Sequence, residues 1–179
     1  QLYTKYIHLH FTTHACAKIL CFLVYFICQI IIFSKRLKMI EVTKESALPD
    51  RNSEIEISSF HFVNNNNVKE NYPNGYEEIY LGLGCFWGAE RLFWNLQNVY
   101  ITSVGYGGGY TKNPTYQDVC SGKTGHAELV KVVFKDDENN FENIVKVFFE
   151  NHDPTQGMRQ GNDIGTQYRS CIFLKNEAH

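Results

Sequence analysis

The sequence predicts an α+β fold in which two helices cover a four-stranded mixed sheet, as a two-layer sandwich. Two observations indicate this fold. Four segments of the chain alternate or are β-branched as strands are, and two others place apolar side chains at helical spacing. Their order is β-α-β-β-α-β, the split arrangement that is called ferredoxin-like. Because such a topology serves many functions, the function has to be argued from the site.

The first half of this pattern runs from Glu78 to Tyr106. Residues 78–83 alternate like a strand. The next segment, residues 88–96, has apolar side chains at helical spacing, namely Ala89, Leu92, Phe93 and Leu96. Residues 99–106 alternate again and are rich in β-branched side chains, which predicts the second strand. A glycine-rich loop and a short turn at residues 115–119 follow.

The second half of the pattern repeats the order strand, helix, strand. Residues 128–134 predict a strand, with Val130, Val132 and Phe134 on one of its faces. An amphipathic helix follows, because five apolar side chains fall at i, i+3, i+4, i+7 and i+8. They are Phe141, Ile144, Val145, Phe148 and Phe149. Residues 168–174 predict the last strand.

Length, charge and cysteine usage exclude several classes of protein. A chain of 179 residues has room for one domain, and its net charge of −2 offers no basic surface for nucleic acid. The six cysteines form no Cys-x-x-Cys pair, and His126 and His152 are not at zinc-ligand spacing from them. We therefore expect neither a disulfide framework nor a metal site. Free thiols indicate a reducing compartment, which predicts a cytoplasmic protein.

The first 38 residues are apolar and then basic. Residues 19–33 are apolar apart from Gln29, and the basic run SKRLK follows at 34–38. This pattern favours a membrane anchor or an uncleaved signal segment, although the run is shorter than the about 20 residues of a spanning helix unless residues 15–17 extend it to 15–33. The alternative is that the protein starts at Met39 and that residues 1–38 are never translated. A membrane-anchored or organellar location depends on this segment being made.

The next segment, residues 39–75, is polar. It includes four successive asparagines at 64–67, and Pro49 and Pro73 interrupt it. Such a composition predicts a disordered lead-in rather than a second domain. The ordered domain is then expected over residues 76–179.

The strongest local signal is the segment GCFWGAE at residues 84–90, at the junction of the first predicted strand and helix. A cysteine there faces unpaired backbone N–H groups and the positive end of the helix dipole, which both favour the thiolate. Glycines on either side permit a tight turn and the close approach of a substrate. The alternative is a buried Cys85 that acts as a small hydrophobe. The adjacent aromatic residues Phe86 and Trp87 favour a nucleophile instead.

A dinucleotide-binding turn is the rival interpretation of the same segment. Gly82, Gly84 and Gly88 follow a strand, but the third glycine of G-x-G-x-x-G would fall at Trp87. The next strand ends at Tyr106 and three glycines, where such a site would need a carboxylate for the ribose. These departures exclude a nicotinamide cofactor.

Six motifs in order carry a specific resemblance. They are GCFWGAE at 84–90, GYGGGY at 105–110, NPTYQDVCSG at 113–122, TGHAE at 124–128, NHDPTQ at 151–156 and QGNDIGTQYRS at 160–170. In this order and spacing the chain, from about Glu77 to Phe173, resembles the class A peptide methionine sulfoxide reductases. The resemblance implies an enzyme that reduces methionine S-sulfoxide, free or in proteins, and so repairs oxidative damage.

The resemblance also implies the chemical roles of four residues. Cys85 attacks the sulfur and becomes a sulfenic acid while methionine leaves. Glu128 stays protonated until it donates to the sulfoxide oxygen, and the hydroxyls of Tyr116 and Tyr168 hydrogen-bond that oxygen. Taken alone, Glu128 reads as an exposed carboxylate at the start of a strand, and both tyrosines read as core residues.

Three further residues match the family's substrate site. Phe86 and Trp87 would wall the apolar pocket for the methyl group, and Asp163 would act through water or by orienting its neighbours. The alternatives are that the two aromatic side chains belong to the core and that Asp163 is an ordinary turn residue.

This chain departs from the family's pattern in the part that recycles the sulfenic acid. The resemblance implies no bound cofactor, an external thiol reductant in the form of thioredoxin, a monomer, and oxidised proteins as substrates. Many members of the family carry a resolving cysteine near their C-terminus, whereas this chain ends shortly after residues 170–173, so we expect C-terminal elements to be missing. Cys120 is a weak candidate for that role, and Cys171 reads as a small core residue. The second hypothesis is therefore a binding module that holds methionine-like side chains without turnover.

Overall fold

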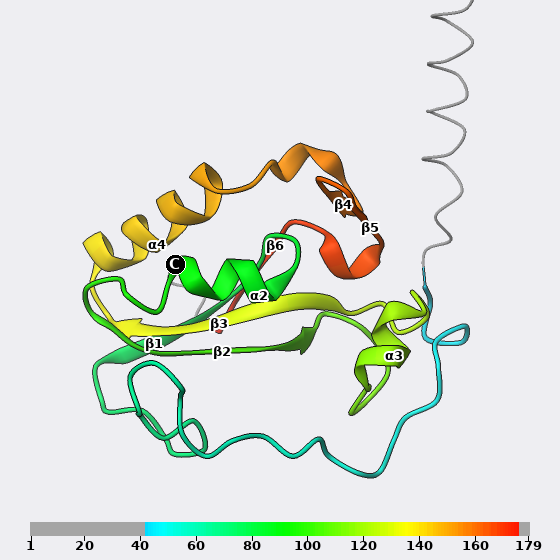
Figure 1. Ribbon diagram of the computed structural model, residues 1–179, viewed down its shortest axis with the longest axis horizontal. Helices are drawn as coiled ribbons and strands as arrows, with labels where there is room; N and C mark the ends of the chain where they lie inside the picture. The colour runs from blue at the N-terminus through cyan, green and yellow to red at the C-terminus, as the bar shows by residue number, and fades with distance from the viewer. Residues whose placement is uncertain (1–41, 176–179) are drawn as a thin grey trace, which may run out of the picture. The chain divides into compact units, whose positions relative to one another are not determined.

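The computed structural model describes residues 42–175, and its centre is a four-stranded sheet (Figure 1). The strands are β1 (Tyr76–Gly82), β2 (Val99–Gly107), β3 (Ala127–Lys135) and β6 (Cys171–Leu174), in the spatial order β2-β3-β1-β6. The four predicted strands of this sheet are confirmed in order, with ends shifted by at most three residues. Strands and helices thus form an α+β fold with few helices.

Every pairing in this sheet is antiparallel. Ile79 of β1 lies opposite Val132 of β3, and Leu81 lies opposite Ile172 of β6. The pairing of β2 with β3 is also antiparallel and shifts in register between Val99 and Ile101. We expected a mixed sheet, and this is corrected: β1 and β2 do run in the same direction, but β3 lies between them, so they never pair.

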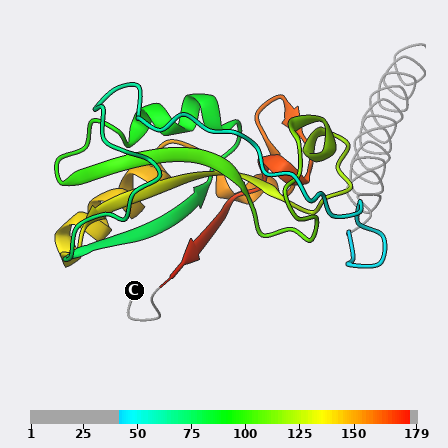
Figure 2. The same cartoon turned by 90° about the horizontal axis from the view of Figure 1, so that it is seen from below.

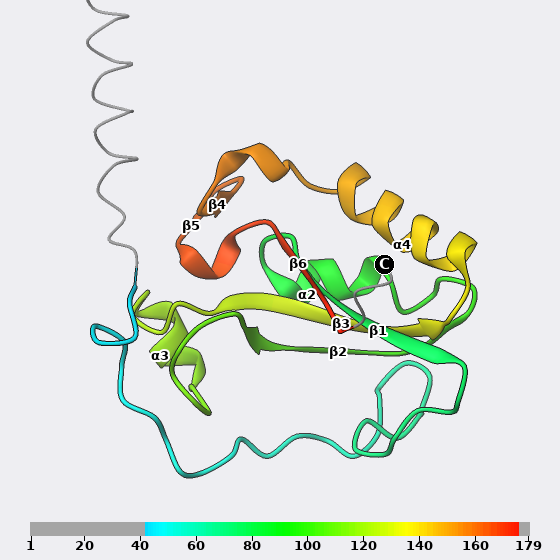
Figure 3. The ribbon, with the colours of Figure 1, turned by 180° about the vertical axis from the view of Figure 1, so that it is seen from behind.

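The helices that follow β1 and β3 lie on one face of the sheet (Figures 1 and 3). After β1, α2 (Phe86–Ala89) continues directly as the 3₁₀ turn η1 (Glu90–Leu92). This helical segment starts two residues before the predicted start at residue 88 and ends four residues before the predicted end at residue 96. After β3 comes α4 (Glu138–Glu150), which starts where the Asp137 carboxylate accepts the N–H of Asn139 at 3.0 Å.

The core lies between this helical layer and the sheet. Ile79 and Leu81 of β1 are fully buried, as are Val130 and Val132 of β3, because alternate residues of a strand point to the same face. From the other layer, Phe93, Ile144 and Phe148 pack onto them. The remaining short elements are α3 (Tyr116–Cys120), η2 (Pro154–Gln156), β4 (Arg159–Gln160), β5 (Asp163–Ile164) and η3 (Thr166–Tyr168).

The lead-in, residues 42–75, runs along the other face of the sheet (Figure 2). In this segment we find one isolated antiparallel β-bridge, between Phe60 and Asn67. Leu48 nevertheless donates its N–H to the carbonyl of Lys123 at 3.0 Å and accepts the Thr111 hydroxyl at 2.8 Å. The expectation of disorder is therefore corrected for this part, because hydrogen bonds to the domain hold it in place.

Within residues 42–175 we find no helical segment with the length and hydrophobicity of a membrane span. The apolar run at 15–33, and with it the predicted N-terminal segment 1–38, lies outside the described residues.

Candidate active site

Cys85 stands at the end of a tight turn between β1 and α2. The preceding Gly84 has φ +96°, a conformation that side chains oppose, and a Cβ built there would lie 2.8 Å from Cγ of Gln160. The turn therefore requires glycine for two reasons. It leaves Cys85 exposed as the N-cap residue of α2, with its carbonyl accepting the N–H of Ala89 at 3.3 Å.

Gln160 links this turn to the β4–β5 hairpin. Its side-chain amide donates to the carbonyl of Asp153 at 3.1 Å, and its side-chain oxygen accepts the N–H of Asp153 at 3.2 Å. The Cβ and Cγ atoms of the same side chain lie next to Gly84. The next strand of the hairpin, β5, carries Asp163.

Glu128 is buried in β3, with 2% of its surface exposed, so it is not the exposed carboxylate of the simpler interpretation. Its Oε2 accepts the backbone N–H of Phe86 at 3.0 Å. Burial raises the pKa of Glu128 above its usual value; the hydrogen bond from Phe86 opposes this, and the charge of Asp163 adds to it. This carboxyl group has a raised pKa and contacts the residue next to Cys85. It is therefore suited to hold and deliver a proton.

The two predicted tyrosines lie within electrostatic reach of this carboxyl group. Tyr168 of η3 has its pKa raised by burial first and then by the charges of Glu128 and Asp163. Tyr116, the exposed first residue of α3, has its pKa raised by a hydrogen bond with Cys120 first, then by the charges of Cys120, Tyr168 and, least, Glu128. Both hydroxyls thus keep their protons and can donate hydrogen bonds. Glu128, Tyr116, Tyr168 and Asp163 thus come together from separate segments. Cys85 is linked to them through the next residue, Phe86, which donates to Glu128.

Tyr106 belongs to the same cluster, although it was not among the predicted site residues. It lies directly opposite Glu128 in the β2–β3 register, and its ring centroid is 5.6 Å from that of Phe86. Burial, followed by the charge of Glu128, raises the pKa of Tyr106 to about 12. The sequence pattern predicts a strand that ends at Tyr106, but the register that places Tyr106 opposite Glu128 is a property of the pairing.

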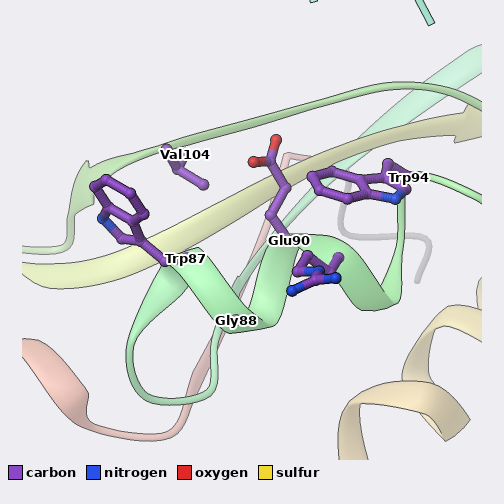
Figure 4. Close-up of a pocket in the computed structure, with 6 residues that line it drawn as sticks. Trp87, Gly88, Glu90, Trp94 and Val104 are labelled. Carbon is purple, nitrogen blue, oxygen red and sulfur yellow. The ribbon is translucent and has the colours of Figure 1, made fainter. Parts of the chain in front are cut away.

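The two predicted pocket residues lie in different surroundings. Phe86 is 6% exposed and packs into the core next to Tyr106. Trp87 is 78% exposed and lines a surface groove, with its indole ring beside Val104 of β2 (Figure 4). Of the two rings, Trp87 is the one that an incoming side chain can reach.

The remaining cysteines and histidines differ in surroundings. Cys120 is exposed at the end of α3, whereas Cys171 is half-buried and its burial raises the pKa of its thiol. His126 accepts the N–H of Gly109 at Nδ1, and His152 lies with Nε2 2.8 Å from the Ser170 hydroxyl, as structural residues do. No cluster of three or more metal-ligating side chains occurs in the part of the chain that the structure describes.

Comparisons with known proteins agree with this arrangement. The family model described as peptide methionine sulfoxide reductase matches residues 77–179. The mitochondrial peptide methionine sulfoxide reductase of Bos taurus is 56% identical over 138 residues, which are 77% of this chain and 59% of that protein. Peptide methionine sulfoxide reductase MsrA of Agrobacterium fabrum is 56% identical over 135 residues, which are 75% of this chain and 62% of that protein.

The fold is likewise similar to that of solved structures. Methionine sulfoxide reductase A of Corynebacterium diphtheriae superposes with a TM-score of 0.70 at 43% identity, over 76% of this chain and 64% of that one. Mxr1 of Saccharomyces cerevisiae in its reduced form gives a TM-score of 0.56 at 32% identity, over 61% of this chain and 65% of that one. This chain spans about three fifths of the length of the two curated relatives above.

Proposed function

Because this chain belongs to the peptide methionine sulfoxide reductase family, we propose that it is an oxidoreductase that reduces methionine S-sulfoxide to methionine through Cys85. The observation that carries the proposal is the buried Glu128 carboxyl group, hydrogen bonded at 3.0 Å to the residue after the exposed Cys85. Nucleophile and acid are thereby held side by side by the backbone.

The chemical step moves one oxygen atom from substrate to enzyme. The Cys85 sulfur attacks the sulfoxide sulfur, while Glu128 gives its proton to the sulfoxide oxygen. The new bond between the two sulfur atoms and the bond between the methionine sulfur and its oxygen then break as the hydroxyl group moves to Cys85, which becomes a sulfenic acid. The cysteine sulfur is thereby oxidised by two electrons and the methionine sulfur is reduced by two. Methionine then leaves. The raised pKa of Glu128 supports this role, since the acid has to be protonated before it can donate.

The tyrosines and Asp163 assist this step. Tyr116 and Tyr168 donate hydrogen bonds to the sulfoxide oxygen, on which negative charge grows as the sulfur is attacked. Asp163 is a positioning residue whose charge helps to keep Glu128 protonated. Trp87, with its exposed ring, covers the methyl group of the substrate.

Turnover requires that the sulfenic acid is reduced. We propose an external dithiol, in the form of thioredoxin, which takes the oxygen away as water and becomes a disulfide; no bound cofactor takes part. The substrates are methionine sulfoxide in oxidised proteins and the free amino acid, and the enzyme acts as a monomer in the cytoplasm. The strand order β2-β3-β1-β6 supports describing its sheet as the split, ferredoxin-like arrangement.

A single-turnover assay tests the proposed function. The full chain is reduced, freed of reductant and mixed with the separate S and R epimers of N-acetyl methionine sulfoxide. We expect about one equivalent of methionine from the S epimer only, with loss of the Cys85 thiol and no product from Cys85→Ser. A folded chain that yields no methionine from either epimer would instead be a binding module without catalysis.

A further inference from the structure

The loop between β2 and α3 sets the position of Tyr116, because Tyr116 is the first residue of α3. The start of this helix is fixed by a capping box. The Thr115 hydroxyl accepts the N–H of Asp118 at 3.2 Å, and the Asp118 carboxylate accepts the N–H of Thr115 at 2.8 Å. The place of Tyr116 relative to Glu128 therefore depends on what holds the residues before Thr115.

One side of this loop is held by the segment that leads into β3. The N–H of Tyr110 donates to the carbonyl of Thr124 at 2.9 Å. His126 accepts the N–H of Gly109 at Nδ1 and therefore donates from Nε2 to the carbonyl of Thr111 at 2.7 Å. This side of the loop is thus attached to the strand that carries Glu128.

The other side of the loop is held by the lead-in, which passes beside α3 (Figures 1 and 2). The Asp50 carboxylate accepts the N–H of Lys112 at 2.7 Å, and the N–H of Arg51 donates to the carbonyl of Lys112 at 3.0 Å. Two successive residues of the lead-in thereby bind both backbone groups of Lys112.

The residues on either side of Lys112 are bound by the same stretch of the lead-in. The hydroxyl of Thr111, which is buried, donates to the carbonyl of Leu48 at 2.8 Å. The side-chain amide of Asn113 donates to the carbonyl of Arg51 at 3.1 Å. Asn113 has φ +49°, a conformation that surrounding contacts have to hold. Residues 48–51 thus bind three successive residues of the loop, and we call them the lead-in clamp.

The clamp also lies close to the cap of α3. Hydrogen bonds with Thr115 lower the pKa of Asp118 first, and the nearby charge of Arg51 lowers it further. Arg51 therefore favours the ionised carboxylate that closes the capping box in front of Tyr116.

From these contacts we propose that Leu48, Asp50 and Arg51 are positioning residues, which hold the loop so that the Tyr116 hydroxyl reaches the sulfoxide oxygen. The inference rests on the proposed function, in which Tyr116 donates a hydrogen bond to that oxygen. The clamp touches no substrate atom and acts through Tyr116, since a small displacement of a hydrogen-bonding group weakens its effect on the reaction. A purely structural lead-in would stabilise the fold without setting the rate.

A kinetic double-mutant cycle tests the inference. Asp50→Ala, Tyr116→Phe and the double variant are compared with wild type in the full chain, by the single-turnover rate at saturating N-acetyl methionine S-sulfoxide. We expect Asp50→Ala to slow wild type about three- to tenfold, as the loss of a hydrogen bond does. In the Tyr116→Phe background the same change is expected to have no further effect, because the hydroxyl that it displaces is already gone.

Matched variants separate positioning from stability. Asp50→Asn keeps an oxygen that can accept the N–H of Lys112, so it is expected to restore the rate. Asn66→Ala removes another lead-in hydrogen bond, 2.6 Å long, to the carbonyl of Tyr100 near the start of β2 and is expected to keep the wild-type rate. Urea unfolding shows that each variant is folded. If Asp50→Ala does not fold, Thr111→Val takes its place, since it removes only the hydroxyl bound by Leu48.

The outcomes distinguish this inference from the proposed function. If wild type yields no methionine, the proposed function fails, and the inference with it. If wild type is active but Asp50→Ala slows the Tyr116→Phe enzyme as much as it slows wild type, the proposed function stands and the clamp does not act through Tyr116. A folded Asp50→Ala that reacts at the wild-type rate, or an Asn66→Ala that is equally slow, would likewise overturn the inference alone.

Discussion

The backbone N–H of Phe86 donates to Oε2 of Glu128 at 3.0 Å, and this hydrogen bond joins the residue after Cys85, the proposed nucleophile, to a buried carboxyl group. A protonated carboxyl group can accept a hydrogen bond on one oxygen while the other oxygen carries the proton. Phe86 therefore fixes Oε2 as the acceptor and leaves Oε1 for the proton. The same bond satisfies one of the unpaired N–H groups at the start of α2.

Glu128→Gln is expected to slow the single-turnover rate by about 10²–10⁴-fold, the usual contribution of a general acid. The glutamine oxygen still accepts the N–H of Phe86, so the turn after Cys85 is retained. The rate is measured by rapid quench with N-acetyl methionine S-sulfoxide. A folded variant within tenfold of wild type would show that the proton comes from another group.

The same substitution is expected to stabilise the fold at neutral pH. Because burial raises the pKa of Glu128 in the folded protein, folding resists its ionisation, and the unfolded chain ionises from its ordinary value of 4.5 upward. Wild type thus loses stability as the pH rises from 4.5 through the raised pKa, whereas Glu128→Gln does not. Urea unfolding at several pH values checks this: the difference in unfolding free energy grows with pH and then levels off. A difference that does not depend on pH would contradict the raised pKa.

The sequence predicts the elements of this site better than their mutual placement. Cys85 at a strand–helix junction and the helix over residues 138–150 follow from local spacing, because capping and periodicity are local properties. The burial of Glu128 and its pairing with Tyr106 depend on β3 lying in the middle of the sheet, which no local pattern specifies. The first helical segment ends at Leu92, before the predicted residue 96, and the chain reaches β2 through Asn98, which has φ +66°.

Gly84→Ala is expected to lower the free energy of unfolding by about 1–3 kcal/mol, because φ +96° disfavours a side chain and the new Cβ would contact Gln160. Activity falls as well, since the turn holds Cys85. The matched control is Gly88→Ala in α2, where a Cβ meets no atom within 4 Å. Chemical unfolding of both variants checks the prediction. Equal stability of the two would mean that the turn relaxes without cost.

His61→Leu tests whether the lead-in contributes to the stability of the domain. His61 is buried, accepts the N–H groups of Val63 and Asn64 at Nδ1, and therefore donates from Nε2 to the Thr102 hydroxyl at 3.0 Å. Leucine leaves the N–H groups of Val63 and Asn64 without this acceptor and removes the donor to Thr102, so we expect a loss of about 1–3 kcal/mol. The neighbouring Phe62, which is fully exposed, provides the control Phe62→Leu. If both variants unfold at the same denaturant concentration, the lead-in does not stabilise the domain.

Tyr106→Leu is expected to move the pH profile of the reaction to lower pH. The Tyr106 ring packs against Phe86 directly opposite Glu128 and helps to keep water from the carboxyl group. A smaller side chain admits water, the effect of burial on the pKa of Glu128 weakens, and the acid loses its proton at a lower pH. The decline of the single-turnover rate with rising pH then begins earlier than in wild type. Tyr106→Phe keeps the ring and is expected to keep the profile, so a shift in both variants would assign the effect to the hydroxyl instead, and a shift in neither would show that Tyr106 does not shield Glu128.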